Sequence, residues 1–72
     1  MSRNDLIGVA RIGKRYVVLK GLSADTQWSR RYARYAVYKL RKGEYFVSRS
    51  AALVAAHDLQ KKDASEYGVR EL

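Results

Sequence analysis

The segment that most constrains the fold is DLIGVARIGKRYVVLKGL, residues 5–22, in which two apolar runs flank the dipeptide Gly13-Lys14. Valine, isoleucine and leucine at this density favour extended strands. A two-residue gap that begins with glycine is typical of a hairpin closed by a type II′ turn. The segment therefore predicts an antiparallel β-hairpin that pairs Ile12 with Arg15. The pairs expected further out are Ala10 with Val17 and Gly8 with Leu19.

Both faces of this hairpin are apolar, although the second face also carries Arg11 and Lys20. A strand pair with one face in water shows polar residues on that face. Two apolar faces therefore predict either a central place in the sheet or a partner on the second face. The first face carries Leu6, Ala10, Ile12, Val17 and Leu19, and the second carries Ile7, Val9, Tyr16 and Val18.

The segment WSRRYARYAVYKLRKGEYFV, residues 28–47, allows two structures. In the first it is an amphipathic helix, with Ser23 as a candidate N-cap and Gly43 beyond the C-terminal end. One stripe of that helix would consist of Trp28, Tyr32, Tyr35, Ala36 and Lys39.

In the second structure the segment is a hairpin that turns at Lys42-Gly43 and places Arg41 opposite Glu44. Tyrosine and valine prefer strands, and the opposite-charge pair stabilises the register. We favour this hairpin over residues 32–48, preceded by a loop or short helical turn over residues 23–31. Its core face carries Ala36, Tyr38, Leu40, Tyr45 and Val47, and its other face carries Tyr35, Lys39, Arg41 and Phe46.

Residues 50–63 predict an amphipathic helix with Ser50 as N-cap, because alanine and leucine recur at helical spacing. The tail, residues 64–72, predicts either a fraying end or a short strand. The chain as a whole predicts one small α+β domain over residues 1–72. Its expected architecture is a small antiparallel sheet of two hairpins, with three or four strands, packed against one C-terminal helix.

The sequence contains few groups suited to catalysis. It has no cysteine and one histidine, His57. Disulfides and thiolate metal sites are therefore excluded, and we expect no metal site. The serines do not lie in a nucleophile motif, and no phosphate-binding glycine loop is present. We expect a protein that binds rather than catalyses, without a cofactor.

The formal net charge is +8, and residues 1–49 hold twelve of the fifteen lysines and arginines but three of the seven acids. Such a localised basic region favours a polyanion, because phosphate contacts release condensed counterions. Arginine binds phosphate and guanine edges, and tyrosine stacks on unpaired bases. The sequence thus predicts binding of DNA, RNA or a nucleoprotein complex through a basic and aromatic hairpin surface. The candidate binding residues are Lys14, Arg15, Lys20, Arg30, Arg31, Arg34, Tyr35, Lys39, Arg41 and Lys42.

The stretch GEYFVSRSAALVAAHDL, in which a strand leads through serines into an alanine-rich helix, resembles part of two kinds of DNA-binding domain. These are the domains of a class of plant transcription factors and the arm-binding domains of tyrosine integrases. The resemblance covers about a quarter of the chain. It implies a three-stranded sheet with a C-terminal helix.

Two other roles fit the same sequence. One is a small inhibitor of phage or mobile-element type, for example anti-CRISPR-like, that binds an acidic protein partner or a nucleoprotein of the host. The other is a homodimer in which the second apolar face of the first hairpin completes a shared core. No apolar run reaches the length of a membrane span and the first residues lack the apolar region of a signal peptide. We therefore expect a cytoplasmic protein without a membrane partner.

Overall fold

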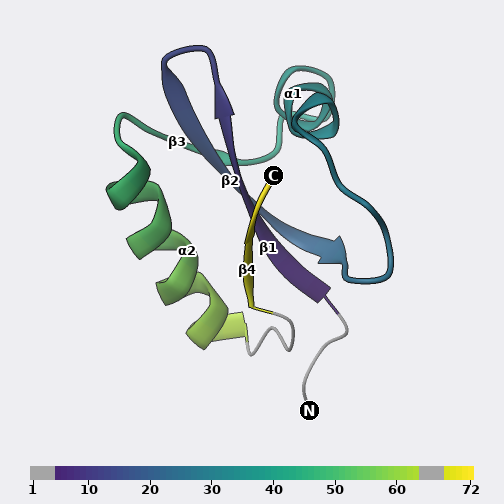
Figure 1. Cartoon of the computed structure of the whole chain (residues 1–72), viewed down its shortest axis with the longest axis vertical. Helices are drawn as coiled ribbons and strands as arrows, with labels where there is room; N and C mark the ends of the chain where they lie inside the picture. Colours follow the sequence, from purple (N-terminus) through teal and green to yellow (C-terminus); the bar gives the residue numbers. More distant parts are fainter. Residues whose placement is uncertain (1–4, 64–67) are drawn as a thin grey trace.

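The computed structural model describes residues 5–63 and 68–72. It shows a four-stranded sheet in the order β3-β2-β1-β4, with one helix on each face (Figure 1). The expected α+β class is confirmed. The sheet is mixed rather than antiparallel, because β4 runs parallel to β1, and a second helix accompanies the C-terminal one. The elements are β1 (Asp5–Ile12), β2 (Arg15–Ser23), α1 (Arg30–Tyr38), β3 (Glu44–Phe46), α2 (Arg49–Asp63) and β4 (Val69–Glu71).

The first hairpin, β1 and β2, has the predicted register. Ile12 pairs with Arg15, and the pairs Ala10 with Val17 and Gly8 with Leu19 follow. Gly13 opens the turn with a φ of 62°. This left-handed conformation is the one that a type II′ turn requires at its first position, and glycine adopts it without a Cβ clash.

Strand β2 contains a bulge that the alternation of the sequence does not reveal. Lys20 and Gly21 together lie opposite the single residue Ile7, and Gly21 has a φ of 75°. The extra residue shifts the alternation of side chains by one position. As a result Leu19 and Leu22, three residues apart, both pack in the same cluster beneath α1.

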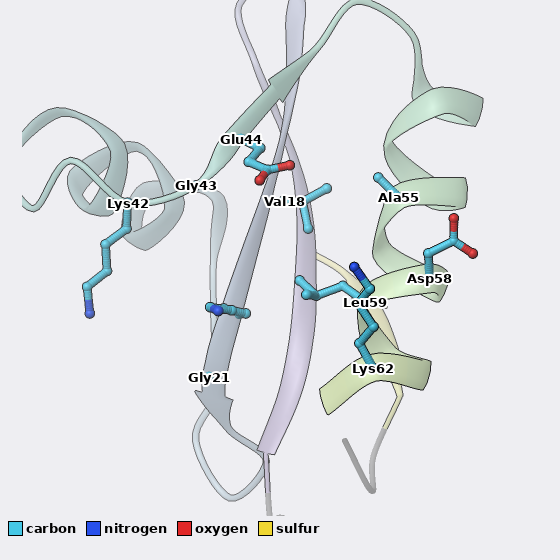
Figure 2. Close-up of a pocket in the computed structure, with 10 residues that line it drawn as sticks. Val18, Gly21, Lys42, Gly43, Glu44, Ala55, Asp58, Leu59 and Lys62 are labelled. Atoms are coloured by element: carbon cyan, nitrogen blue, oxygen red, sulfur yellow. The ribbon is translucent and has the colours of Figure 1, made fainter. Parts of the chain in front are cut away.

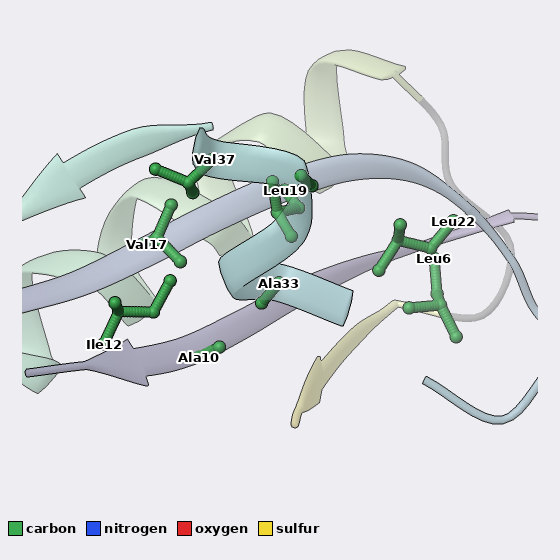
Figure 3. Close-up of a cluster of buried hydrophobic side chains, with 9 residues drawn as sticks. Leu6, Ala10, Ile12, Val17, Leu19, Leu22, Ala33 and Val37 are labelled. Carbon is green, nitrogen blue, oxygen red and sulfur yellow. The ribbon is translucent and has the colours of Figure 1, made fainter. Parts of the chain in front are cut away.

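The two faces of the hairpin form two separate cores, so β1 and β2 occupy the centre of the sheet, which is one of the two arrangements that their apolar faces predict. On one face, Ala33, Ala36 and Val37 of α1 pack on the hairpin (Figure 3). On the other, Ala52 and Ala56 of α2 do the same. The apolar hairpin face that suggested a homodimer is therefore covered by a helix of the same chain. The α1 cluster contains Leu6, Ala10, Ile12, Val17, Leu19 and Leu22, and the α2 cluster contains Ile7, Val9 and Val18.

The hairpin predicted over residues 32–48 is wrong. Most of its first strand lies in α1, and the expected pair of Arg41 with Glu44 does not form, because Glu44 pairs with Val18 of β2. The expected loop or helical turn over residues 23–31 includes the last residue of β2 and the first two residues of α1.

Capping and burial explain why this segment is helical despite its tyrosines and valine. The N-cap is Ser29 rather than Ser23, and its hydroxyl accepts the N–H of Tyr32 at 3.4 Å. Ala33 and Ala36 are fully or almost fully excluded from solvent, at 0% and 1% exposure. Tertiary burial of an apolar stripe supplies most of the stability of a short helix, and it outweighs the strand preference of individual residues.

Strand β3 forms the edge of the sheet beside β2, and Gly43 brings the chain there. A Cβ atom on Gly43 would lie 2.6 Å from Cγ2 of Val17 and 2.9 Å from Cδ2 of Leu19, and the φ of Gly43 is 102°. Only glycine fits such a close approach in this conformation. The glycine that suggested a hairpin turn therefore serves to place β3 against β2.

Helix α2 confirms the helix expected over residues 50–63, although its cap is Ser48 and not Ser50. The hydroxyl of Ser48 accepts the N–H of Ala51 at 3.2 Å. The helix leads from β3 at one edge of the sheet to β4 at the other edge (Figure 1). Of the tail, residues 69–71 form β4 and bear out the short strand, while residues 64–67 lie outside the described residues.

Several side chains that the predicted second hairpin would place in its core are exposed. Tyr38 and Val47 have 63% and 87% of their surface accessible, and Leu40 and Tyr45 also remain exposed. Of that set only Ala36 is buried. Within the described residues, no helix is long and apolar enough to cross a membrane.

Candidate nucleic-acid interface

The outward face of α1 carries two arginines and two tyrosines. Arg31, Arg34, Tyr35 and Tyr38 follow the spacing i, i+3, i+4 and i+7, which places them on one side of a helix. All four are exposed, and Tyr35 and Tyr38 have 52% and 63% of their surface accessible. We refer to these four residues as the α1 outer face. The helix contains no acidic residue, so its own sequence does not neutralise the two guanidinium groups.

Further cations surround both ends of α1. Arg30 is the first residue of the helix and also lines a hollow of about 190 Å³ that it shares with Arg11, Arg49 and Glu71. Lys39 is the C-cap, and its backbone N–H donates to the carbonyl of Tyr35 at 2.8 Å.

The chain folds back just beyond the C-terminus of α1. The N–H of Lys42 donates to the carbonyl of Ala36 at 3.0 Å, and Arg41 has a φ of 53°. This is a left-handed conformation that a residue with a Cβ rarely adopts. The reversal keeps Arg41 and Lys42 close to the helix rather than in an extended strand.

The cations of the first hairpin divide between the two faces of the sheet. Lys14 and Arg15 lie at the β1–β2 turn. Arg15 is on the α1 side, because its pairing partner Ile12 packs beneath α1. Its guanidinium carbon lies 5.5 Å from the centre of the Tyr45 ring, within the range of a cation–π contact.

Lys20 lies instead on the other side, where it lines a groove between α2 and the β2–β3 edge of the sheet. Figure 2 shows this groove. The groove has a volume of about 810 Å³. Lys42 also lines it, so the ten candidate residues do not form one surface. The lining residues are Val18, Lys20, Gly21, Lys42, Gly43, Glu44, Ala55, Asp58, Leu59 and Lys62.

Tyr38 and Lys62 are among the residues of these surfaces that are absent from the set that the sequence predicts. A strand puts Tyr38 on the face opposite Tyr35, in the expected core, whereas a helix puts both on one side. The signal in the sequence that identifies Tyr38 as a surface residue is its helical spacing from Arg31, Arg34 and Tyr35. Lys62 lies outside the basic region of the sequence, and the packing of α2 on the sheet makes it line the same groove as Lys20.

The ion pair between Arg49 and Glu71 lies at the hollow beside Arg30. The hydrogen bond from Arg49 lowers the pKa of Glu71, and the same contact raises the pKa of Arg49. The pair therefore keeps one negative charge next to this arginine cluster. Among residues 5–63 and 68–72, no three histidine, aspartate or glutamate side chains lie together as a metal site would need, and His57 is exposed.

Comparison with known proteins assigns no family to this arrangement. No protein-family model, no curated protein and no solved structure matches the chain. The function must therefore be inferred from the surfaces of the molecule itself.

Proposed function

We propose that the protein binds nucleic acid through the α1 outer face, with the cations at the two ends of the helix as additional phosphate contacts. The observation that carries the proposal is the helical spacing of Arg31, Arg34, Tyr35 and Tyr38 on an exposed face without acids. Arginine offers a planar fork of donors to phosphate oxygens, and tyrosine offers a ring for stacking and a hydroxyl for donation. Both residue types are common at nucleic-acid contacts.

The covering of the sheet supports a helical rather than a strand-based contact. Each face of β1 and β2 packs against a helix, so in the part of the chain that the structure describes the sheet has no open basic face of the kind expected from the sequence. The described architecture also departs from the resemblance to a three-stranded DNA-binding sheet, because α1 covers one face. In this proposal Arg30, Lys39 and Arg41 extend the contact, and Lys14 and Arg15 add positive charge at the hairpin turn.

The test is a salt titration of binding to a fluorescent oligonucleotide, with double-stranded and single-stranded forms of DNA and RNA. The double variant Arg31→Gln with Arg34→Gln should weaken binding to the preferred form. It should also reduce the slope of log K against log salt by about 1 for each phosphate that is no longer neutralised. The matched control removes two exposed cations elsewhere, Lys61→Gln with Arg70→Gln. Equal weakening in the two double variants, or no binding by the unchanged protein, would contradict the proposal.

A second candidate function is inhibition of a host protein or nucleoprotein, as in the phage or mobile-element type of protein. The exposed apolar side chains of Leu40, Tyr45 and Val47 favour it, because such residues anchor protein interfaces. Three results together would support this candidate over the first. A partner should remain bound after nuclease treatment. The variant Leu40→Asp should lose this partner, and the double variant Arg31→Gln with Arg34→Gln should retain it.

A further inference from the structure

The groove between α2 and the β2–β3 edge has the construction of a small-ligand site. Its volume of about 810 Å³ lies within the range of roughly 300–1,000 Å³ common for ligand pockets. The groove exists because β3 is short: its pairing with β2 covers Tyr16, Val17 and Val18 and leaves Lys20 and Gly21 without a neighbouring strand on that side.

Three apolar side chains line the groove between its charged residues. Val18 of β2 contributes to one side, and Ala55 and Leu59 of α2 contribute to the other (Figure 2). Ala55 and Leu59 are half-buried, so part of their surface remains available to a ligand. A flat apolar body can cover these side chains with one face. A rigid ring loses less conformational entropy on binding than a flexible chain of the same area.

The charged side chains are distributed unequally along the groove. Strand β2 and helix α2 run in the same direction in Figure 2, where Gly21 and Lys62 lie toward one end of the groove. Lys20 directly precedes Gly21 in β2, so it lies toward the same end. Glu44 lies toward the other end, and the carboxylate of Asp58 points away from the apolar walls (Figure 2). The end with Lys20 and Lys62 is therefore basic. Ammonium groups on two different elements can both donate to the oxygens of one phosphate.

We propose that this groove binds a nucleotide, with the base against Val18, Ala55 and Leu59 and the phosphate between Lys20 and Lys62. The shared chemistry is a nucleoside phosphate, in which a sugar joins a planar base to a phosphate ester. A free mononucleotide or the 5′-terminal nucleotide of a single strand can supply it. The site is separate from the α1 outer face, because α1 and α2 pack on opposite faces of the sheet. It does not depend on the proposed function of α1.

The test is a titration of the intact protein with adenosine monophosphate, followed by amide chemical shifts and by calorimetry. Adenosine monophosphate should shift the amides of Val18, Ala55 and Leu59, and inorganic phosphate or adenosine alone should bind at least tenfold more weakly. A 5′-phosphorylated single strand, compared with the same strand without its phosphate, distinguishes a strand end from a free nucleotide as the source. Shifts confined to α1, or none at all, would overturn the proposal.

Two matched pairs of variants locate the site. Lys62→Gln should weaken binding of adenosine monophosphate about tenfold, as expected when one charge-assisted hydrogen bond is removed, and Lys61→Gln should leave it unchanged. Ala55→Phe should block the groove, whereas Val54→Phe alters an exposed position that does not line it. Thermal unfolding of all four variants shows whether each is folded. Equal effects within either pair of folded variants would also overturn the proposal, since they would indicate a general charge or surface effect.

Discussion

The guanidinium of Arg49 holds the carboxylate of Glu71 by two hydrogen bonds, from Nε to Oε1 at 2.6 Å and from Nη2 to Oε2 at 2.8 Å. The contact joins the first residue of α2 to the last residue of β4. It therefore connects the helix on one face of the sheet to an edge strand. Such a two-bond arginine–carboxylate contact fixes geometry as well as charge.

This contact makes part of the stability depend on pH. The pKa of Glu71 is lowered in the folded protein, so its contribution is complete above the ordinary value of 4.5 and is lost as the pH falls through the folded value. Glu71→Gln should therefore be less stable than the unchanged protein at neutral pH, and this difference should shrink in acid. Urea unfolding in a series of buffers measures it. Glu44→Gln, on the other edge strand, is the control, and a difference for Glu71→Gln that persists in acid would refute the assignment.

Gly43 should be among the positions least tolerant of substitution. Gly43→Ala places a Cβ atom 2.6 Å from Val17 Cγ2 at a φ of 102°. The combined cost of overpacking and of a left-handed alanine is about 2–4 kcal/mol of the free energy of unfolding. Chemical denaturation followed by circular dichroism provides the measurement.

Gly13 is the matched control for this substitution. Gly13 also has a positive φ, of 62°, but nothing lies within 4 Å of the position of its added Cβ. Gly13→Ala should therefore carry only the conformational cost, about 1–2 kcal/mol. Equal losses of stability at the two glycines would show that the close approach of Gly43 to Val17 is unimportant.

Arg41 is expected to reduce stability in its present conformation. It has a φ of 53°, which costs a residue with a Cβ about 1–2 kcal/mol. Arg41→Gly removes this cost but increases the freedom of the unfolded chain, so we expect a net gain of about 0.5–1 kcal/mol. The same variant should bind nucleic acid more weakly, because one cation is removed. Parallel melting and binding measurements test both parts, and a fall in stability would contradict the first.

The N-cap of α1 should influence both the fold and the proposed interface. Ser29→Ala removes the acceptor for the N–H of Tyr32 and should cost about 0.5–1 kcal/mol, whereas Ser29→Asp should retain the cap. Ser23→Ala, at the cap position expected from the sequence, should have a smaller effect. Thermal melting of the three variants gives the comparison, and a larger loss of stability at Ser23 would show that the helix begins elsewhere.

The sequence was sufficient to predict the first hairpin, because local and long-range preferences agree there. Gly13 favours the turn, and the apolar runs on either side of it favour strands. At residues 30–46 the local and the long-range preferences disagree. The tyrosines, the valine and Lys42-Gly43 favour strands locally, and burial of Ala33 and Ala36 against the hairpin favours a helix. Strand β4 has three residues, too few for a periodic pattern, and its place depends on pairing with β1.

For the candidate interface, the sequence predicted residue types but not their arrangement. Arg31, Arg34 and Tyr35 have the chemistry expected of binding residues and are exposed. Whether they share a side with Tyr38 depends on the secondary structure, because a strand and a helix sort the same residues differently. Lys20 and Lys42 line the groove beside α2 rather than the α1 outer face, and this depends on the position of α2. That position is a property of the folded molecule alone.

The pairing of β4 with β1 also determines when the sheet can be completed during synthesis. Residues 7–9 are made before their partners, residues 69–71. Until then the backbone donors and acceptors along that side of β1 have no strand partner, and an unpaired edge is prone to join other chains. The β1–β2 hairpin can form from neighbouring residues well before this. The nascent chain thus carries a hairpin with an open side, and α2 must be synthesised before that side is closed.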